Sequence, residues 1–145
     1  MKKKIIRMTT IPLSLKHLIN GQMRFMRENG FDVIMISADG KDVESVRHNE
    51  ECKHVVFPLT RKITPFKDFI VLIKLYIFLK KEKPFIVHTH TPKAGIIGML
   101  ASYFAGVPVR LHTVAGLPLM EAIGFKRVIL NFVEKLTYKC STKVY

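Results

Sequence analysis

Cysteine is scarce in this sequence, and its scarcity narrows the kinds of site that the chain can carry. Only Cys52 and Cys140 occur among the 145 residues, and they stand far apart, in no spacing typical of metal ligands. This pattern gives no sign of the disulfide framework of small secreted domains, and it suits a reducing compartment.

Glycine-rich phosphate motifs are also missing. No GxGxxG follows the first apolar segment, and neither GxxxxGKS nor GxxxxGKT occurs in the chain. Because these motifs hold the phosphates of dinucleotides and nucleoside triphosphates, their absence argues against nicotinamide-dependent and P-loop chemistry. No spacing of Ser, His and Asp, or of Cys and His, indicates a nucleophilic catalytic site.

Long hydrophobic runs are absent as well. The most apolar run, residues 69–79, is roughly half as long as a bilayer span, and Lys74 interrupts it. The N-terminus begins with lysines, as signal peptides do, but Arg7 breaks the apolar residues and no small-residue cleavage site follows. We therefore expect residues 4–10 to form a buried first strand.

Acidic residues are few, with 11 Asp and Glu against 24 Lys and Arg, so the formal net charge is +13 at pH 7. Such an excess favours anionic partners, namely nucleic acid, acidic lipid surfaces or phosphorylated small molecules, and charge alone does not choose among them. Hydrophobic residues make up 48% of the chain, which is enough for a packed core in one domain.

What the sequence has in abundance is an alternation of strand and helix patterns. Apolar runs predict strands at residues 4–10, 31–37, 54–59, 85–90 and 107–114, and the start of a sixth at 141–145. Helical spacing predicts helices over residues 15–29, 65–83, 92–105 and 125–136. Ser14, Thr64 and Thr91 are expected as N-caps, and residues 38–51 as a polar loop.

This order predicts an α/β fold, a Rossmann-like parallel sheet with helices on both faces. Ligands of such sheets bind at the carboxyl ends of the strands, near the point where the strand order reverses. That rule selects four segments of the chain, which are residues 9–14, 37–40, 88–93 and 112–121.

The stretch HTHTPKAGIIGM, residues 88–99, allows three interpretations. His88 and His90 lie two apart on a strand and should point to the same face, but a metal site would need a third ligand that the spacing does not supply. Hydrogen-bonded histidines at the rim of a crevice fit better. The helix start after Thr91, with Lys93 beside it, could also bind an anion. Gly95 and Gly98 indicate close packing of that helix on the sheet.

Two other regions also keep alternatives open. After the fifth strand, His112, Thr113 and Glu121 flank a glycine turn, and a buried structural role for His112 is as well supported as a functional one. The helix over residues 65–83 is apolar almost all round and carries lysines. It could attach to an anionic membrane through Lys67, Lys74, Lys80 and Lys81, or it could be a deeply packed helix with a solvated basic end.

The run VHTHTPKAGIIGMLASYFAGVPVRLHTVAGLP, followed by EKLTYKCSTKVY, resembles the N-terminal domain of glycosyltransferase family 4, in particular bacterial enzymes that build capsular, O-antigen and other surface polysaccharides. The resemblance covers nearly the whole chain. It implies the N-terminal half of a GT-B architecture, in which two Rossmann-like domains face a cleft. By the same resemblance, residues 1–145 are the acceptor-side domain, and a C-terminal domain that binds the nucleotide-sugar donor is absent from this chain.

The resemblance further implies a retaining hexosyltransferase that needs no metal and no other cofactor. Its acceptor would be a lipid-linked saccharide, and the enzyme would lie in the cytoplasm, peripheral on the inner face of the cytoplasmic membrane. This chain alone is expected to be inactive. The substrate-binding candidates are Pro12, Ser14, His88, His90, Lys93, Thr113 and Gly116. The catalytic residues are unassigned, with His112 and Glu121 as weak candidates.

Two positions depart from the family pattern. Residues 9–14 lack the glycine pair that many relatives carry in the loop after the first strand, and Ala115 stands where many have a histidine that contacts the donor sugar. The alternatives to a glycosyltransferase are a basic nucleic-acid-binding domain and a generic nucleotide-binding Rossmann domain. The scattered basic residues and the missing glycine fingerprint count against them, so we expect no nucleic-acid partner.

Overall fold

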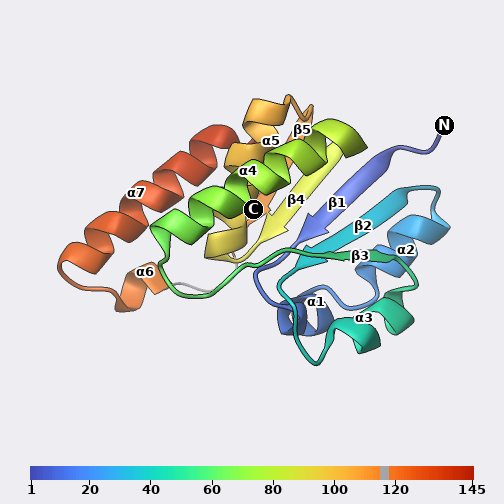
Figure 1. Cartoon of the computed structure of the whole chain (residues 1–145), viewed down its shortest axis with the longest axis horizontal. Coiled ribbons are helices and arrows are strands. Elements are labelled where there is room, and N and C mark those ends of the chain that lie inside the picture. Colours follow the sequence, from blue (N-terminus) through green and yellow to red (C-terminus); the bar gives the residue numbers. More distant parts are fainter. Residues whose placement is uncertain (115–117) are drawn as a thin grey trace.

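A single twisted parallel sheet forms the centre of the protein in a computed structural model, which describes residues 1–114 and 118–145 (Figure 1). The strand order is β3-β2-β1-β4-β5-β6, so the direction of winding reverses between β1 and β4. The strands are β1 (Lys4–Met8), β2 (Asp32–Ser37), β3 (Lys53–Val56), β4 (Ile86–His90), β5 (Val109–Thr113) and β6 (Lys143–Val144). The fold is thus the predicted Rossmann-like α/β class.

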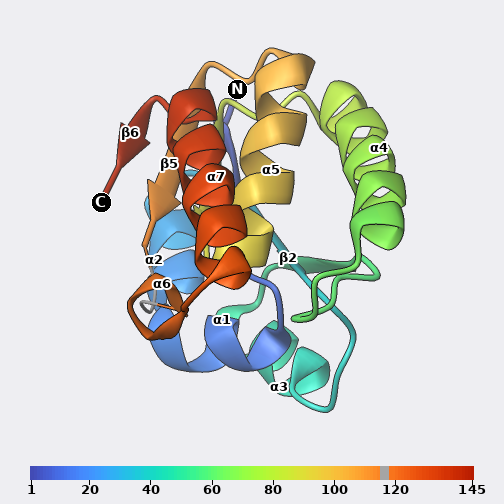
Figure 2. The same ribbon diagram turned by 90° about the vertical axis from the view of Figure 1, so that its left-hand side faces the viewer.

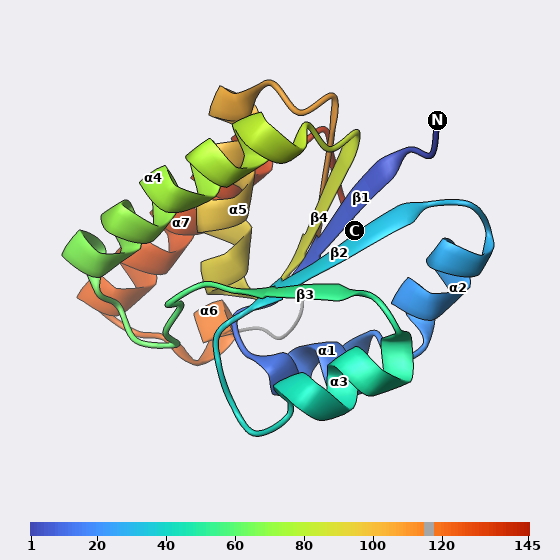
Figure 3. The same cartoon turned by 45° about the vertical axis from the view of Figure 1, so that its right-hand side comes forward.

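Helices cover both faces of the sheet, as Figures 2 and 3 show from two sides. One face carries α1 (Pro12–Leu18), α2 (Gln22–Glu28) and α3 (Val43–Glu50). The other carries α4 (Pro65–Glu82), α5 (Pro92–Ala105) and α7 (Phe125–Cys140), with α5 in the middle, and the short α6 (Pro118–Glu121) precedes α7. This arrangement follows from right-handed crossovers on either side of the reversal.

Each face of the sheet has its own apolar core. Along β1, Ile6 and Met8 belong to the cluster beneath α4 and α5, whereas Ile5 belongs to the cluster beneath α1 to α3. The alternation follows from the two-residue period of a strand. Arg7 lies on the same side of β1 as Ile5, facing α1 to α3, and it is buried although it is charged.

Helix α5 packs unusually close to the sheet, as its glycines predicted. A Cβ atom at Gly98 would lie 2.4 Å from Cγ2 of Thr89, and one at Gly95 would lie 2.5 Å from Cε1 of His112. Both distances are shorter than van der Waals contact. Gly95 and Gly98 are therefore required for close packing of the helix on β4 and β5.

The structure differs from the prediction at three points within the first 50 residues. The first helix is interrupted, because α1 ends at Leu18 and α2 begins at Gln22 after Gly21, whose φ is 76°. The N-cap of α1 is Ile11 and not Ser14, because Pro12 already occupies the first helical turn. Residues 43–50, expected within a loop, form α3, and the polar sequence of that helix buries only Val43, Val46 and Glu50.

The starts of the two long helices that begin with a Thr-Pro pair were predicted correctly. Helices α4 and α5 begin at Pro65 and Pro92, with Thr64 and Thr91 as their N-caps. Their C-caps are Lys83 and Gly106, which both have positive φ. Within the described ranges, 1–114 and 118–145, none of the helices is long and apolar enough to cross a bilayer.

Candidate substrate-binding site

The candidate site lies at the carboxyl ends of β1 and β4, where the winding reverses. His88 and His90 of β4 point to the face that α2 covers, and their ring centroids are 4.3 Å apart. This confirms the prediction that the two side chains share a face. His88 Nε2 lies 2.8 Å from the hydroxyl oxygen of Thr113, the last residue of β5, so the sheet brings three predicted site residues together.

Arg7 is the residue in this cluster that the sequence did not identify. Its side chain reaches from β1 beneath α2, where Nη2 donates to Nε2 of His90 at 3.0 Å and to Oε1 of Gln22 at 2.8 Å. Only 1% of Arg7 is exposed. The one available signal was a charged residue between the apolar residues Ile6 and Met8 of a predicted strand.

The charge of Arg7 is balanced by hydrogen bonds and not by an ion pair. No carboxylate of residues 1–114 or 118–145 forms a salt bridge with it. Burial lowers the pKa of Arg7 to about 10, against a smaller upward effect of Glu50, so the guanidinium stays protonated at neutral pH. The group formed by Arg7, Gln22 and His90 therefore carries a permanent positive charge beside the carboxyl end of β4.

The two histidines beside Arg7 are neutral. Burial lowers the pKa of His88 to about 3 and that of His90 to about 2, and the nearby positive charge of Arg7 adds to both shifts. A neutral imidazole has one donor nitrogen and one acceptor nitrogen. These side chains can therefore make directional hydrogen bonds to a polar ligand without changing charge in the physiological range.

An anion site at the start of α5 was one of the interpretations left open by the sequence, and in the structure the backbone N–H of Ala94 there has a partner within the chain. The hydroxyl of Thr10 accepts from the N–H of Ala94 at 3.3 Å and lies 2.8 Å from the hydroxyl of Thr91. Thr91 has a φ of 77°, which is unusual for a β-branched residue. The loops after β1 and β4 thus hold each other through two threonines.

Lys93 lies on the other side of this helix start. Its ammonium group contacts Oδ2 of Asp68 at 2.5 Å and the backbone oxygen of Lys62, and 13% of the side chain is exposed. This ion pair joins the first turns of α4 and α5. A role for Lys93 in binding phosphate stays a prediction, and it would require exchange of Asp68 for the ligand.

The remaining predicted residues are spread around this edge of the sheet. Pro12 is buried and Ser14 half-buried in α1, and Glu121 is exposed at the end of α6. Gly116 and Ala115 fall outside the described residues. His112 faces the opposite side of the sheet, where its Nδ1 lies 2.9 Å from the hydroxyl of Thr89 beneath α5. That position matches the buried structural alternative for His112.

A second buried charge that the sequence did not reveal sits at the start of α2. The carboxylate of Glu50, at the end of α3, accepts from the backbone N–H groups of Gly21 and Arg24 at 2.5 and 2.9 Å. Only 2% of Glu50 is exposed. This helix N-terminus, which could have held an anionic ligand, is therefore occupied by a carboxylate of the chain itself.

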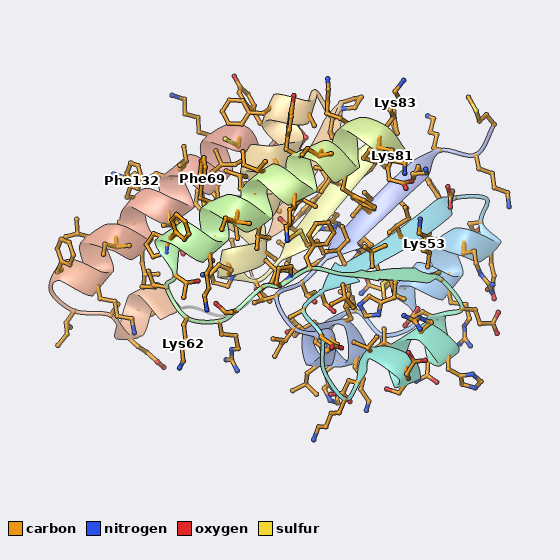
Figure 4. All side chains as sticks on the ribbon, in the orientation of Figure 1. Lys53, Lys62, Phe69, Lys81, Lys83 and Phe132 are labelled. Carbon is orange, nitrogen blue, oxygen red and sulfur yellow. The ribbon has the colours of Figure 1, made fainter. Side chains whose placement is uncertain are left out.

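The outer helical layer is rich in exposed apolar side chains. Figure 4 shows Phe69 of α4 and Phe132 of α7 projecting from this layer, and the lysine side chains expected to contact a membrane are also exposed. We call this surface the outer apolar face. Its members on α4 are Phe66, Phe69, Ile70, Ile73 and Ile77, and those on α6, α7 and their junction are Met120, Ile123, Phe125, Val128 and Phe132.

Comparison with solved structures places the fold among GT-B proteins. The chain superposes on MurG of Acinetobacter baumannii with a TM-score of 0.65 at 14% identity, covering 98% of this chain and 40% of that one. It superposes on UDP-GlcNAc 2-epimerase of Neisseria meningitidis, bound to UDP-GlcNAc, with a TM-score of 0.66 at 14% identity, covering 95% and 39%. The protein thus has the fold of the N-terminal half of a GT-B protein.

Comparison with known sequences gives the family. The profile described as "Glycosyl transferase 4-like" matches residues 12–145, so the chain belongs to this glycosyltransferase family. It is 39% identical over 142 residues to the capsular polysaccharide biosynthesis glycosyltransferase CapM of Staphylococcus aureus. It is 33% identical over 147 residues to an Escherichia coli enzyme named UDP-Gal:alpha-D-GlcNAc-diphosphoundecaprenol alpha-1,3-galactosyltransferase.

These two matches cover 98% and 99% of this chain but only 36% and 38% of the relatives. The chain therefore spans little more than a third of the length of either relative.

Proposed function

We propose that this chain is the acceptor-side domain of a retaining glycosyltransferase that elongates a lipid-linked saccharide in surface polysaccharide synthesis. The observation that carries the proposal is family membership over residues 12–145. Support for the substrates comes from the name of the E. coli relative, which specifies a UDP-sugar donor and a diphosphoundecaprenol-linked acceptor. The donor would bind chiefly to a second, C-terminal domain.

In this proposal the acceptor sugar lies across the carboxyl ends of the strands near His88, His90 and Thr113, with Pro12 and Ser14 of α1 beside it. The neutral imidazoles and the threonine hydroxyl supply directional hydrogen bonds of the kind that sugar hydroxyls accept and donate. Lys93, released from Asp68, would offset charge on a diphosphate. Neither metal nor another cofactor takes part, and Glu121 is the candidate base because it is exposed on α6.

The outer apolar face would rest on the inner surface of the cytoplasmic membrane, where lipid-linked acceptors are anchored. Phe66 and Phe125 are each 79% exposed, and lysines flank the α4 part of the face. A helix that presents apolar side chains beside lysines binds anionic lipid surfaces through burial and charge together. The first turns of α4 and α7 lie on the same side of the molecule as the carboxyl ends of the strands (Figures 1 and 2). Contact of these turns with the membrane would place the candidate site close to the lipid.

Sugar transfer is the test of the proposed function. A protein that joins this chain to a C-terminal nucleotide-sugar domain, which we call the two-domain enzyme, should transfer a radiolabelled sugar to a polyprenyl-diphosphate saccharide. The donors to be tried are a panel of UDP-sugars. The 145-residue chain alone should show no transfer, since the proposed donor site lies on the second domain. Transfer by the chain alone would refute the division of roles between the domains. Salt-sensitive binding of an oligonucleotide at physiological ionic strength, without any transfer, would favour the nucleic-acid alternative.

A further inference from the structure

The contacts of Arg7 determine which nitrogen of His90 carries the hydrogen. An arginine side chain has five N–H donors and no acceptor. Because Nη2 of Arg7 lies 3.0 Å from Nε2 of His90, Nε2 must accept and must itself be unprotonated. The ring is then neutral with its hydrogen on Nδ1, so Nδ1 can donate a hydrogen bond but cannot accept one.

Arg7 is itself held in a fixed position. The same Nη2 donates to Oε1 of Gln22 at the first position of α2, and Nη1 lies 3.4 Å from the sulfur of Met26 one turn later. Nε has no partner in the described part of the chain. The guanidinium thus spans from β1 to β4 beneath α2, and its orientation is set by its contacts with α2.

Resting on the proposed function, we propose that Arg7 is a positioning residue that fixes His90 as an Nδ1–H donor, and that His90 donates this hydrogen to a hydroxyl oxygen of the acceptor sugar. Three observations support the assignment: the contact between the two side chains, the burial of both, and the place of His90 at the last position of β4. The substrate class is a saccharide whose contacting oxygen accepts a hydrogen bond.

The alternative role for Arg7 is purely structural, as a long side chain that fills the space between β1 and α2. Methionine has a similar length and carries no charge, and its substitution for Arg7 leaves no charged partner behind, because Gln22 and His90 are neutral. Arg7→Met should therefore fold, and it separates the effect of the charge and donor from the effect of packing. Arg47→Met is the matched control, because Arg47 is exposed and pairs only with Glu44 among the described residues.

The tautomer can be read directly from the 15N chemical shifts of the histidine ring in the labelled 145-residue chain. We expect His90 to show an unprotonated Nε2 and a protonated Nδ1 at pH 7, with no change in Arg47→Met and loss of this pattern in Arg7→Met. A His90 ring protonated on Nε2 in the native chain would overturn the inference. So would a native pattern that persists in a folded Arg7→Met variant.

The role in catalysis is tested in the two-domain enzyme with a pair of substitutions at His90. The side-chain amide of asparagine lies about as far from Cα as Nδ1 does, whereas that of glutamine lies about as far as Nε2. His90→Asn should therefore retain at least about tenfold more kcat/KM for the acceptor than His90→Gln, on the scale of one directed hydrogen bond. Equal activities, or better activity in His90→Gln, would overturn the donor role. Absence of transfer by the native enzyme would refute the proposed function and leave the tautomer result standing.

Discussion

At the scale of single residues, the His88–His90 pair has a consequence for stability that does not depend on function. Both side chains have pKa values well below that of a histidine in an unfolded chain, about 6.5. The unfolded chain therefore binds protons that the folded chain does not bind as the pH falls through 6.5. Folding stability must decrease on acidification, and the loss continues down to the folded pKa values.

Between pH 7.5 and pH 5 the loss should be about 2 kcal/mol for each of these two histidines. His54 and His112, whose pKa values burial also lowers, act in the same direction. Urea unfolding at pH 7.5, 6 and 5 measures the effect, and a His88→Gln, His90→Asn double variant should show a shallower dependence. His48→Gln, which changes an exposed side chain, is the control. A free energy of unfolding that is independent of pH over this range would contradict the prediction.

Lys93 provides a second prediction at this scale. In the two-domain enzyme, Lys93→Ala should lower kcat about tenfold if the ammonium group stabilises a diphosphate in the transition state. Asp68→Asn removes the charge that holds Lys93 and should leave kcat within a few-fold of the native value. Equal losses in both variants would instead show that the ion pair between α4 and α5 is what matters.

The sequence allowed some of these residues to be placed and not others. That His88 and His90 share a face follows from the two-residue period of a strand, so the local sequence was enough to predict it. Arg7, Gln22 and His90 come from three elements, and their contacts depend on where α2 crosses the sheet. The role of Glu50 could not be predicted for the same reason. Its carboxylate caps the start of α2 through Gly21 and Arg24, which lie 29 and 26 residues away in the chain.

At the scale of elements, helix α5 is the part of the fold that the sequence specified best. Thr91 and Pro92 fixed its start, Gly106 its end, and its internal glycines its distance from the sheet. Helix α3 was missed because an eight-residue polar helix with two buried valines leaves too short a pattern to recognise. Local signals therefore predicted elements with strong caps, whereas helices held by tertiary contacts were found only in the structure.

Gly98→Ala is the sharpest test of the packing of α5. In an ordinary helix interior, alanine is more favourable than glycine by roughly 1 kcal/mol. Here the added methyl group would overlap Thr89 and approach the sulfur of Met8, so the variant should be destabilised by about 1–3 kcal/mol. Chemical denaturation gives the sign directly. A stabilised Gly98→Ala variant would show that α5 lies farther from β4 than the structure places it.

At the scale of the whole molecule, the Rossmann-like class and the helices on both faces were predictable because the strand–helix alternation extends through the chain. The outer apolar face was only partly predictable. The sequence showed excess apolar surface on α4, but the contribution of α6 and α7 became visible only when the structure showed which side of α7 the sheet leaves uncovered.

Membrane binding by this face should require both its charge and its apolar side chains. The 145-residue chain should co-sediment with vesicles containing phosphatidylglycerol more strongly than with neutral phosphatidylcholine vesicles. Lys74→Glu with Lys81→Glu should lower the partition coefficient roughly tenfold or more, at about 1 kcal/mol for each lysine. Lys41→Glu with Arg47→Glu, on the opposite side of the sheet, is the control of equal charge change. Equal losses in the two double variants would point to net charge and not to a defined surface.

Acceptor binding by this chain is the measurement that tests the central claim most directly. In 15N-labelled protein, a short-chain polyprenyl-diphosphate saccharide should shift the resonances of His88, His90 and Thr113 in a saturable manner, whereas a UDP-sugar at the same concentration should leave them nearly unchanged. Saturable shifts of these residues by the UDP-sugar, with none caused by the lipid-linked saccharide, would contradict the assignment of this domain to the acceptor.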